Sequence, residues 1–372
     1  MHRVALINGP NLNLLGTREP TIYGSTTFPD LMARCQEWGE AMNLEVAPFQ
    51  SNHEGAIIDR IHEVADDSDG IVINPGAYGH TSYAIHDALT AVGLPAVEVH
   101  ISNIRQREPW RRSSVTAPAA IHAIYGRGVT GYRDALSHLA NRWRFPPETV
   151  PYGDHPDQFA EVRTPHGPGP RHVVLLVHGG FWRHHFARDL MDGLAVDLAE
   201  RGFASWNVEY RRMGEGGGGT ETTGDVRLAV RAAAAHPDTE RLTVVGHEAG
   251  AILALNASAP AEVALCVTMS GITDLLAARQ DRLGDDAAGA LLGGSPPEAL
   301  SPIHRLPLGL PVVLFHGDRD TAVPISHGIR YAETARAAGD TAELVTIDGA
   351  DGSSFLDPRN EAWTRVVSAI ET

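Results

Sequence analysis

Residues 244–250, VVGHEAG, carry the sharpest local signal for the fold of this chain. Two β-branched residues lead into a G-x-E-x-G turn, and the small residues after it, AILALNA (251–257), are typical of a helix. A sharp strand-to-helix turn of this kind lifts its central residue above the end of a parallel sheet. That residue is Glu248, so the turn raises the question of which chemistry, if any, a glutamate performs there.

Strand-like apolar runs alternate with amphipathic stretches such as FPDLMARCQEWGEAMN (28–43) along the whole chain. Continuous apolar strands separated by helices are typical of parallel sheets that are buried on both faces. We therefore predict an α/β protein. The apolar runs are VALIN (4–8), LEVAPF (44–49), GIVINPG (70–76), AVEVHIS (96–102), VVLLVHGG (173–180), ASWNVEY (204–210), LTVVGH (242–247), ALCVTMS (264–270), VVLFHGD (312–318) and AELVTID (342–348).

The alternation breaks once, at RFPPETVPYGDHP (144–156), where prolines cluster. The chain has 372 residues, 43% of them hydrophobic, which is enough for two separate cores. We therefore predict one domain at residues 1–146 and a second at 147–372.

Charge and composition exclude several classes of partner. The net charge is -16, with no basic run, so we expect no nucleic-acid binding. No apolar run approaches 18 residues, so we expect no membrane span, and the first residues lack a signal-peptide pattern. Cys35 and Cys266 are the only cysteines and fall in different predicted domains, so we expect neither a disulfide nor a metal site. A cytoplasmic protein is the simplest interpretation.

All 30 basic residues are arginine, because the chain contains no lysine. Schiff-base catalysis, pyridoxal phosphate chemistry and a Walker A phosphate loop each require a lysine. These three mechanisms are therefore excluded.

Four polar clusters follow strand-like runs in the first domain. Because the carboxyl ends of parallel strands meet at one edge, we expect the clusters to form one crevice. Arginines, amides and histidines together suit a small, oxygen-rich anion. The clusters are NGPNLNLLGTREPTIYG (8–24), NPGAYGHTS (74–82), EVHISN (98–103) and REPWRRSS (107–114), and the crevice would hold Asn11, Arg18, Tyr23, Asn74, His80, Glu98, His100, Arg107, Arg111 and Arg112.

These four clusters resemble, in order and spacing, type II 3-dehydroquinate dehydratase, and the resemblance covers roughly residues 2–143. It implies a flavodoxin-like fold and a homo-oligomer, usually a dodecamer built from trimers. It also implies the dehydration of 3-dehydroquinate to 3-dehydroshikimate through an enolate, without a metal or cofactor.

The resemblance assigns catalytic roles to five residues. Tyr23 matches the base that removes the C2 proton, and Arg18 matches the nearby cation that a tyrosinate needs. Asn11 matches the residue that stabilises the enolate oxygen. His100 matches the acid that protonates the departing C1 hydroxyl, and Glu98, two residues earlier on the same strand face, would orient it and keep it charged.

The remaining matched positions contact substrate in the family. Asp87 matches a residue that reaches across a trimer contact toward a neighbouring site. At Ser113 the family commonly has a histidine, so the 3-amino analogue of dehydroquinate stays open as a substrate. The other substrate-binding positions are Asn74, His80, Ile101, Ser102 and Arg111.

From about residue 150 the chain resembles α/β-hydrolases of the esterase and arylformamidase type. HGGFW (178–182) matches the oxyanion-hole motif, with Gly179 and Gly180, and VVGHEAG matches the nucleophile elbow. FHGDRDTAVP (315–324) matches the segment that bears the triad acid, here Asp320.

The triad itself departs from the family, because ester hydrolysis needs a nucleophile, a histidine and an acid. Glu248 holds the nucleophile position, and Gly352 in GADGSSF (349–355) holds the histidine position. We therefore predict a second domain without hydrolase activity and with a structural or binding role. Three alternatives stay open: a bifunctional enzyme with Glu248-dependent hydrolysis and His184 or His185 as base, a dehydratase for the amino analogue, and a non-catalytic metabolite-binding scaffold.

Overall fold

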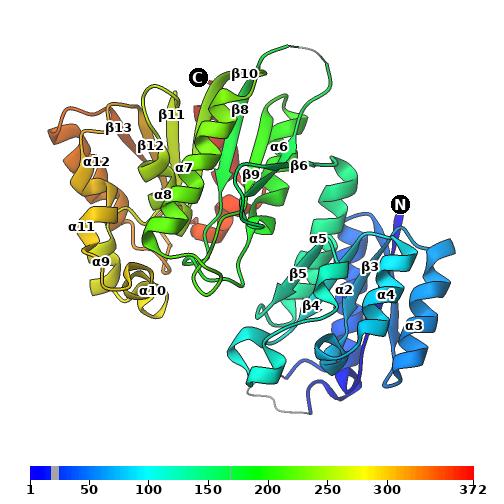
Figure 1. The fold of residues 1–372 in the computed structure, drawn as a ribbon. Helices are drawn as coiled ribbons and strands as arrows, with labels where there is room; N and C mark the ends of the chain where they lie inside the picture. The colour runs from blue at the N-terminus through cyan, green and yellow to red at the C-terminus, as the bar shows by residue number, and fades with distance from the viewer. Residues whose placement is uncertain (18–24, 168) are drawn as a thin grey trace. The chain divides into compact units, whose positions relative to one another are not determined.

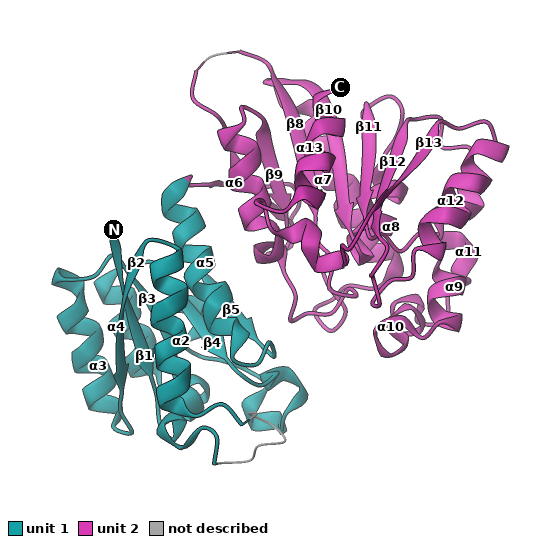
Figure 2. Cartoon of the chain, turned by 180° about the vertical axis from the view of Figure 1, so that it is seen from behind, with its two compact units in different colours: residues 1–144 teal, residues 145–372 magenta. Residues whose placement is uncertain are grey.

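The computed structural model describes residues 1–17, 25–167 and 169–372, and it divides into two compact units. Unit 1 comprises Met1–Arg144 and unit 2 comprises Phe145–Thr372, drawn in teal and magenta in Figure 2. Each unit has its own sheet and its own hydrophobic clusters. That the two units act as separate functional domains, with limits at 146 and 147, stays a prediction.

Unit 1 is built on a sheet of five parallel strands in the order β2-β1-β3-β4-β5. This is the flavodoxin-like strand order, so the predicted fold class is confirmed. The order reverses between β1 and β3, where ligands bind in sheets of this type. The strands are β1 (His2–Asn8), β2 (Leu44–Gln50), β3 (Gly70–Asn74), β4 (Ala96–His100) and β5 (His122–Tyr125).

Helices cover both faces of this sheet (Figure 1). Alternate residues of β1 point to opposite faces: Val4 and Leu6 pack with α2 (Phe28–Ala41) and α5 (Thr130–Arg144), whereas Ala5 and Ile7 pack with the other two helices. This two-sided burial explains the continuous apolar runs in the sequence. The other elements are α3 (Glu54–Glu63), α4 (Tyr83–Val92) and the 3₁₀ turns η1 (Leu12–Leu14), η2 (Val64–Asp66), η3 (Gly76–His80), η4 (Ile104–Gln106), η5 (Pro109–Arg111) and η6 (Ala117–Ala119).

Unit 2 is built on an eight-stranded sheet in the order β13-β12-β11-β10-β8-β9-β7-β6. The strands from β13 to β9 pair in parallel, and β7 and β6 are antiparallel additions at one edge. The strands are β6 (Glu148–Pro151), β7 (Phe159–Arg163), β8 (Arg171–Val177), β9 (Ala204–Val208), β10 (Thr239–His247), β11 (Leu265–Met269), β12 (Val312–Gly317) and β13 (Ala342–Ile347).

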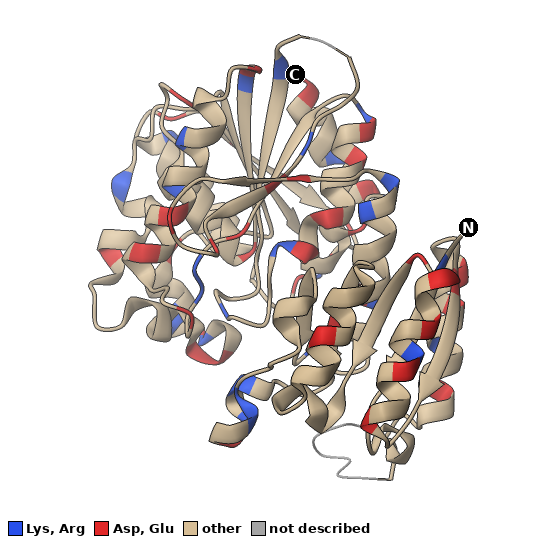
Figure 3. Ribbon diagram, turned by 45° about the vertical axis from the view of Figure 1, so that its right-hand side comes forward, with Lys and Arg blue, Asp and Glu red and all other residues tan. Residues whose placement is uncertain are grey.

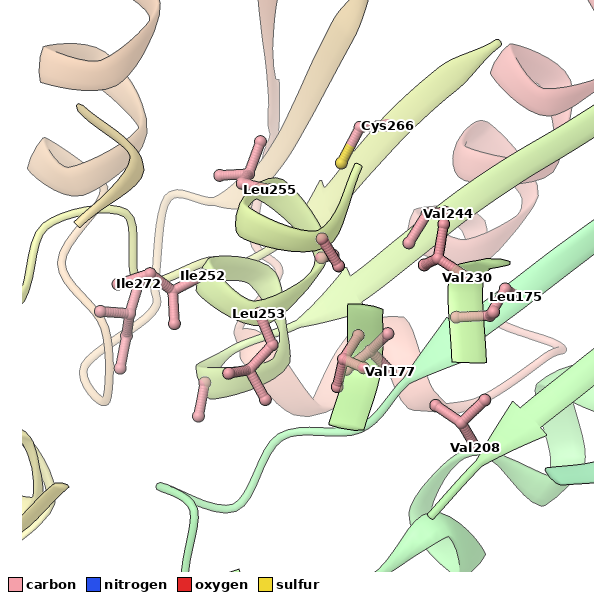
Figure 4. Packing of buried hydrophobic residues seen from close by; sticks show 14 of the residues in the cluster. Leu175, Val177, Val208, Val230, Val244, Ile252, Leu253, Leu255, Cys266 and Ile272 are labelled. Atoms are coloured by element: carbon pink, nitrogen blue, oxygen red, sulfur yellow. The ribbon is translucent and has the colours of Figure 1, made fainter. Parts of the chain in front are cut away.

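The central strand β10 leads into α8 (Ala249–Ala257), which is buried along its whole length. Figure 4 shows Ile252, Leu253 and Leu255 of α8 packed among the strands, near Val177 and Cys266. Helices α6 (Asp192–Glu200) and α13 (Glu361–Glu371) cover the opposite face. The remaining elements are η7 (Arg188–Met191), α7 (Gly219–Ala235), α9 (Leu275–Gln280), α10 (Leu283–Leu292), α11 (Pro297–Leu300), η8 (Pro302–Arg305), α12 (Ser326–Ala337) and η9 (Gly352–Leu356).

The charged residues lie mostly on helices and loops, while the strands are largely uncharged (Figure 3). Acidic residues exceed basic ones, in keeping with the net charge of -16. Among the helices that the structure describes, none is long and apolar enough to cross a membrane.

Candidate functional site

The carboxyl ends of β1, β3 and β4 surround a cavity of about 170 Å³ in unit 1, at the point where the strand order reverses. The segments after these strands supply its walls, because parallel strands all end at the same edge of the sheet. The lining residues are Pro10, Asn11, Leu12, Leu15, Asn74, Gly76, Ala77, His80, His100, Ile101, Ser102, Ile104, Arg107 and Arg111.

His100 and Glu98 form a buried pair at the end of β4. They are two residues apart on one strand face, and His100 Nε2 donates to Glu98 Oε1 at 2.7 Å. His100 is 5% exposed and Glu98 is fully buried. Because Nε2 is bound to the carboxylate, Nδ1 is the nitrogen of His100 that is left for a ligand.

Two hydroxyl groups also donate to the Glu98 carboxylate, one to each oxygen. Ser114 Oγ donates to Oε1 at 2.6 Å and Thr116 Oγ1 donates to Oε2 at 2.5 Å. Burial acts to raise the pKa of Glu98, but hydrogen bonds from His100, Ser114 and Thr116 and the charge of His100 outweigh it, so the pKa lies below its usual value. The carboxylate is therefore ionised at neutral pH.

The side chain of Asn74 is held by a hydrogen-bonded chain in the core. Asn74 Nδ2 donates to Tyr132 Oη at 2.8 Å, and that hydroxyl donates to Asn8 Oδ1 at 2.8 Å. Asn8 and Asn74 are register partners at the ends of β1 and β3. Burial raises the pKa of Tyr132 well above its usual value, which keeps its hydroxyl protonated as a donor. This chain of hydrogen bonds fixes which atom of the Asn74 side-chain amide faces the cavity.

His80 lies opposite His100, with their rings stacked at 6.0 Å between centroids. Its Nδ1 donates to the carbonyl of Ser113 at 2.8 Å. Burial lowers the pKa of His80, which leaves Nε2 of the neutral ring as an acceptor. Trp110 packs edge-on against His80 at 5.9 Å and stacks on Arg111, whose guanidinium carbon lies 4.3 Å from the Trp110 ring centre.

Two further arginines differ in their placement. Arg107 lines the cavity and its guanidinium donates to Ser102 Oγ at 3.4 Å. The prediction that Arg112 lies in the crevice is wrong: Arg112 is exposed, does not line the cavity, and its guanidinium donates to the backbone carbonyl of Arg107 at 3.1 Å. Asn11 lines the cavity in a left-handed conformation with φ 65°, and its backbone amide donates to Asn52 Oδ1 at 2.9 Å.

Most of the residues expected from sequence in the first domain meet at this cavity. Glu98 lies behind His100, Asp87 is exposed on α4 and does not line the cavity, and Arg18 and Tyr23 fall outside the described residues. Sequence reasoning missed Tyr132, Ser114 and Thr116. Ser114 is the last residue of the fourth polar cluster and so offered a weak signal, whereas nothing in the sequence links Tyr132 to Asn74. The residues that reach the cavity as expected are Asn11, Asn74, His80, His100, Ile101, Ser102, Arg107 and Arg111.

In unit 2, Glu248 lies on a strained turn between β10 and α8, with φ 49° and ψ -111°. The two flanking glycines permit the turn, because a Cβ on Gly246 would lie 2.6 Å from Ala251 Cα and one on Gly250 would lie 2.2 Å from Val177 O. The backbone of Glu248 is also bonded on both sides, its amide to Met269 at 2.9 Å and its carbonyl to the amide of Ile272 at 3.0 Å. This is the geometry of a nucleophile elbow.

The carboxylate of Glu248 binds the backbone amides that follow β8. Its Oε2 accepts from Gly180 N at 2.5 Å and from Phe181 N at 3.1 Å. Gly179 does not donate, but a Cβ on it would lie 2.6 Å from Glu248 Oε2, so its bare Cα lets the carboxylate approach. Glu248 is 7% exposed, and burial raises its pKa to about 7 although these amides act in the opposite direction.

Asp320 and Gly352 face one another on the loops after β12 and β13. Asp320 Oδ1 accepts from the amides of Ala322 and Val323, each at 2.9 Å. A Cβ on Gly352 would lie 3.1 Å from Asp320 Oδ2. A side chain at position 352 would therefore contact Asp320, and glycine leaves Asp320 Oδ2 without a hydrogen-bond partner among the described residues.

His247 lies between Gly352, on the loop after β13, and Gly179, on the segment after β8. Its Nε2 donates to the carbonyl of Gly352 at 2.9 Å, and a Cβ on Gly179 would lie 2.8 Å from its Nδ1. Burial lowers the pKa of His247 to about 4, so the ring is neutral. His247 is therefore uncharged near neutral pH, and its one N–H is used in the bond to Gly352.

The first unit is similar to known dehydroquinases. Residues 2–140 match the family model described as dehydroquinase class II. A catabolic 3-dehydroquinase 1 from Neosartorya fischeri is 58% identical over 137 residues, which are 37% of this chain and 91% of that protein. A 3-dehydroquinate dehydratase from Bacillus cereus is 53% identical over 144 residues, 39% of this chain and 99% of that protein.

The second unit is similar to esterases in fold. Residues 162–334 match a family model described as BD-FAE. An esterase 2 structure from Thermogutta terrifontis, phosphonylated by sarin, is 22% identical, covers 60% of this chain and 92% of that one, and has a TM-score of 0.52. The α/β-hydrolase fold predicted for the second half of the chain is confirmed.

Proposed function

Because the chain belongs through residues 2–140 to the type II dehydroquinases, which are hydro-lyases, we propose that it converts 3-dehydroquinate to 3-dehydroshikimate and water with His100 as acid and Tyr23 as base. The observation that carries the acid assignment is the His100–Glu98 pair, buried at the wall of the cavity. A histidine that must protonate a leaving group is best placed beside a carboxylate that is already ionised.

The reaction proceeds in two steps. The Tyr23 phenolate removes the C2 proton, and the electrons of the broken C–H bond form an enolate across C2 and the ketone. The enolate then collapses to a C1–C2 double bond, the C1–oxygen bond breaks, and His100 Nδ1 supplies the proton that releases water. Arg18 stabilises the phenolate and Asn11, through a water, stabilises the enolate oxygen; the roles of Tyr23 and Arg18 rest on sequence alone.

The polar residues of the cavity hold the substrate. Arg111 and the amides of Ile101 and Ser102 bind the carboxylate and an adjacent hydroxyl, and Asn74 and His80 bind the remaining hydroxyls. The chain from Asn74 to Asn8 and the Ser113 carbonyl on His80 fix these two side chains before substrate arrives. We add Arg107 to this group, because it lines the cavity beside Ser102.

We also propose a trimer-based dodecamer in which Asp87 serves a neighbouring site. Asp87 is exposed on α4 and does not line the cavity of its own chain, which is what a residue working across a subunit contact requires. Light scattering of the full chain tests this, and a monomer would contradict it.

For unit 2 we propose a binding role without ester hydrolysis. Glu248 Oε2 occupies the amides that would stabilise an oxyanion, and Gly352 offers no base. Neither the stabilisation of an oxyanion on the substrate nor the hydrolysis of an acyl intermediate is therefore supported. These contacts also argue against Glu248 as a nucleophile. Its carboxylate points at the amides of Gly180 and Phe181 and accepts the hydrogen bonds that the oxyanion of a substrate would need.

Ultraviolet absorbance of the conjugated product tests the dehydratase directly. We expect wild type to turn over 3-dehydroquinate and Tyr23→Phe to lose roughly a hundredfold or more in kcat while still binding the substrate. Binding without turnover in wild type would instead support a metabolite-binding scaffold. In parallel, aryl acetate hydrolysis that is present in wild type and absent in Glu248→Ala would overturn the proposal for unit 2.

A further inference from the structure

Four buried polar atoms near the elbow of unit 2 have no hydrogen-bond partner within the described parts of the chain. Each belongs to a side chain that is at least nine-tenths buried. Native proteins pair nearly all such atoms, so unpaired ones that cluster indicate a missing partner. The atoms are Asp320 Oδ2, Ser270 Oγ, His247 Nδ1 and Glu248 Oε1.

Two of the atoms flank the position where Gly352 lacks a side chain. A Cβ on Gly352 would lie 3.1 Å from Asp320 Oδ2 and 3.6 Å from Ser270 Cβ. His316 Nε2 lies 3.9 Å from the same Asp320 oxygen, but it donates to the carbonyl of Val323 at 2.8 Å, so it does not satisfy the carboxylate. Gly352 itself is only half-buried, so one side of this position borders solvent.

The ring of His247 joins this position to Glu248. One nitrogen, Nε2, donates to the carbonyl of Gly352, and the other lies against Gly179, which also borders the Glu248 carboxylate. The charge of Asp320 contributes to the raised pKa of Glu248, so the two carboxyl groups are close enough to interact. The four atoms therefore belong to one cluster.

The unpaired acceptor beside Gly352 is the Asp320 carboxylate. Its Oδ2 can only accept, and Ser270 Oγ can donate one hydrogen but makes no bond to it. His247 Nδ1 can only accept, because Nε2 carries the proton, whereas Glu248 Oε1 carries a proton below about pH 7 and is then a donor. A molecule that satisfies Asp320 Oδ2 must therefore bring an N–H or O–H group. Water has two such groups but no charge, so it would leave the buried carboxylate uncompensated.

We propose that the space beside the Cα of Gly352 binds a small protonated nitrogen base, of the size of an imidazolium ion, that donates to Asp320 Oδ2. Such a cation supplies a hydrogen-bond donor and a compensating charge together, which makes the bond stronger than a neutral one. The molecule then occupies the space that the side chain of a triad histidine would fill. This inference rests on the proposed binding role of unit 2.

Calorimetric titration of the full chain with imidazole at about pH 6, where the ring is largely protonated, tests the proposal. We expect saturable binding by wild type that weakens roughly tenfold or more in Asp320→Asn, which removes the charge, and in Gly352→His, which fills the position. Asp348→Asn is the matched control, because Asp348 is exposed and its loss changes the net charge equally. It should bind as wild type does.

Asp320→Asn removes the charge and Gly352→His fills the space, so the test stands even if one of these variants misfolds. Thermal unfolding shows whether each of them is folded. Heats that do not saturate in wild type, or equal affinity in Gly352→His and Asp348→Asn, would overturn the proposal. The titration measures binding and the aryl acetate assay measures turnover, so this inference and the proposed loss of hydrolysis can fail separately.

Discussion

Glu248 Oε2 accepts a hydrogen bond from the backbone amide of Gly180 at 2.5 Å, across 68 residues of sequence. In a hydrolase of this fold such an amide serves the oxygen of the substrate. Here Glu248 Oε2 occupies that amide, which supports the proposed loss of hydrolysis. The contact follows from the length of the side chain, since its carboxyl group reaches the amides of Gly180 and Phe181 from the turn.

The first prediction concerns the missing triad. Glu248→Ser combined with Gly352→His should hydrolyse an aryl acetate at least roughly a hundredfold faster than either single variant, because all members of a triad act as a unit. The serine frees the amides of Gly180 and Phe181, and the histidine reaches Asp320. Release of the coloured phenolate measures the rate. Activity no higher than in Glu248→Ser alone would show that more than the triad has been lost.

The second prediction concerns stability and pH. The pKa of Glu248 is raised from 4.5 to about 7, so the folded state holds a proton that the unfolded state has lost in this window, and stability falls as pH rises through it. Glu248→Gln removes the titration. Its stability relative to wild type should increase between about pH 4.5 and pH 7 by up to about 3 kcal/mol.

Thermal unfolding of unit 2 across this range gives the measurement for Glu248→Gln. Glu240→Gln, at an unburied position on β10, is the control and should leave the pH dependence of wild type unchanged. Parallel pH curves for wild type and Glu248→Gln would contradict the raised pKa.

The third prediction separates the role of Glu98 from that of His100. Glu98→Gln should lower kcat roughly tenfold to a hundredfold and should move the alkaline limb of the pH–kcat profile to lower pH, because a neutral amide no longer favours a protonated ring. A purely structural role would lower stability without moving the profile. Glu37→Gln, exposed on α2, is the control and should leave both quantities unchanged.

The fourth prediction concerns the hydrogen bonds from Asn74 to Tyr132 and from Tyr132 to Asn8. Tyr132→Phe leaves buried groups of Asn8 and Asn74 unpaired, so we expect a loss of about 1–3 kcal/mol in the free energy of unfolding and a KM several-fold higher with a smaller change in kcat. Denaturant unfolding and steady-state kinetics measure the two effects. Tyr83→Phe removes the same hydroxyl from an exposed position, and it should behave as wild type.

Sequence patterns were sufficient for both folds and for most of the residues at the cavity. Apolar runs buried on two faces require parallel sheets, and the ends of parallel strands meet at one edge, so Asn74, His100 and Arg111 could be brought together from their places along the chain. The G-x-E-x-G pattern placed Glu248 on a strand-to-helix turn, and the resemblance to α/β-hydrolases put Gly352 at the position that lies beside Asp320 in the structure.

The directions of side chains, and the contacts between residues far apart in the sequence, could be determined only from the folded structure. No spacing rule connects Tyr132 to Asn74 across 58 residues, because that contact depends on how α5 packs against the sheet. The sequence also does not determine the direction of the Glu248 side chain. A carboxylate that faces the site and one that is bonded to Gly180 and Phe181 are compatible with the same sequence and the same backbone. The strand order positions a residue, but the hydrogen-bond partners within reach select its side-chain direction.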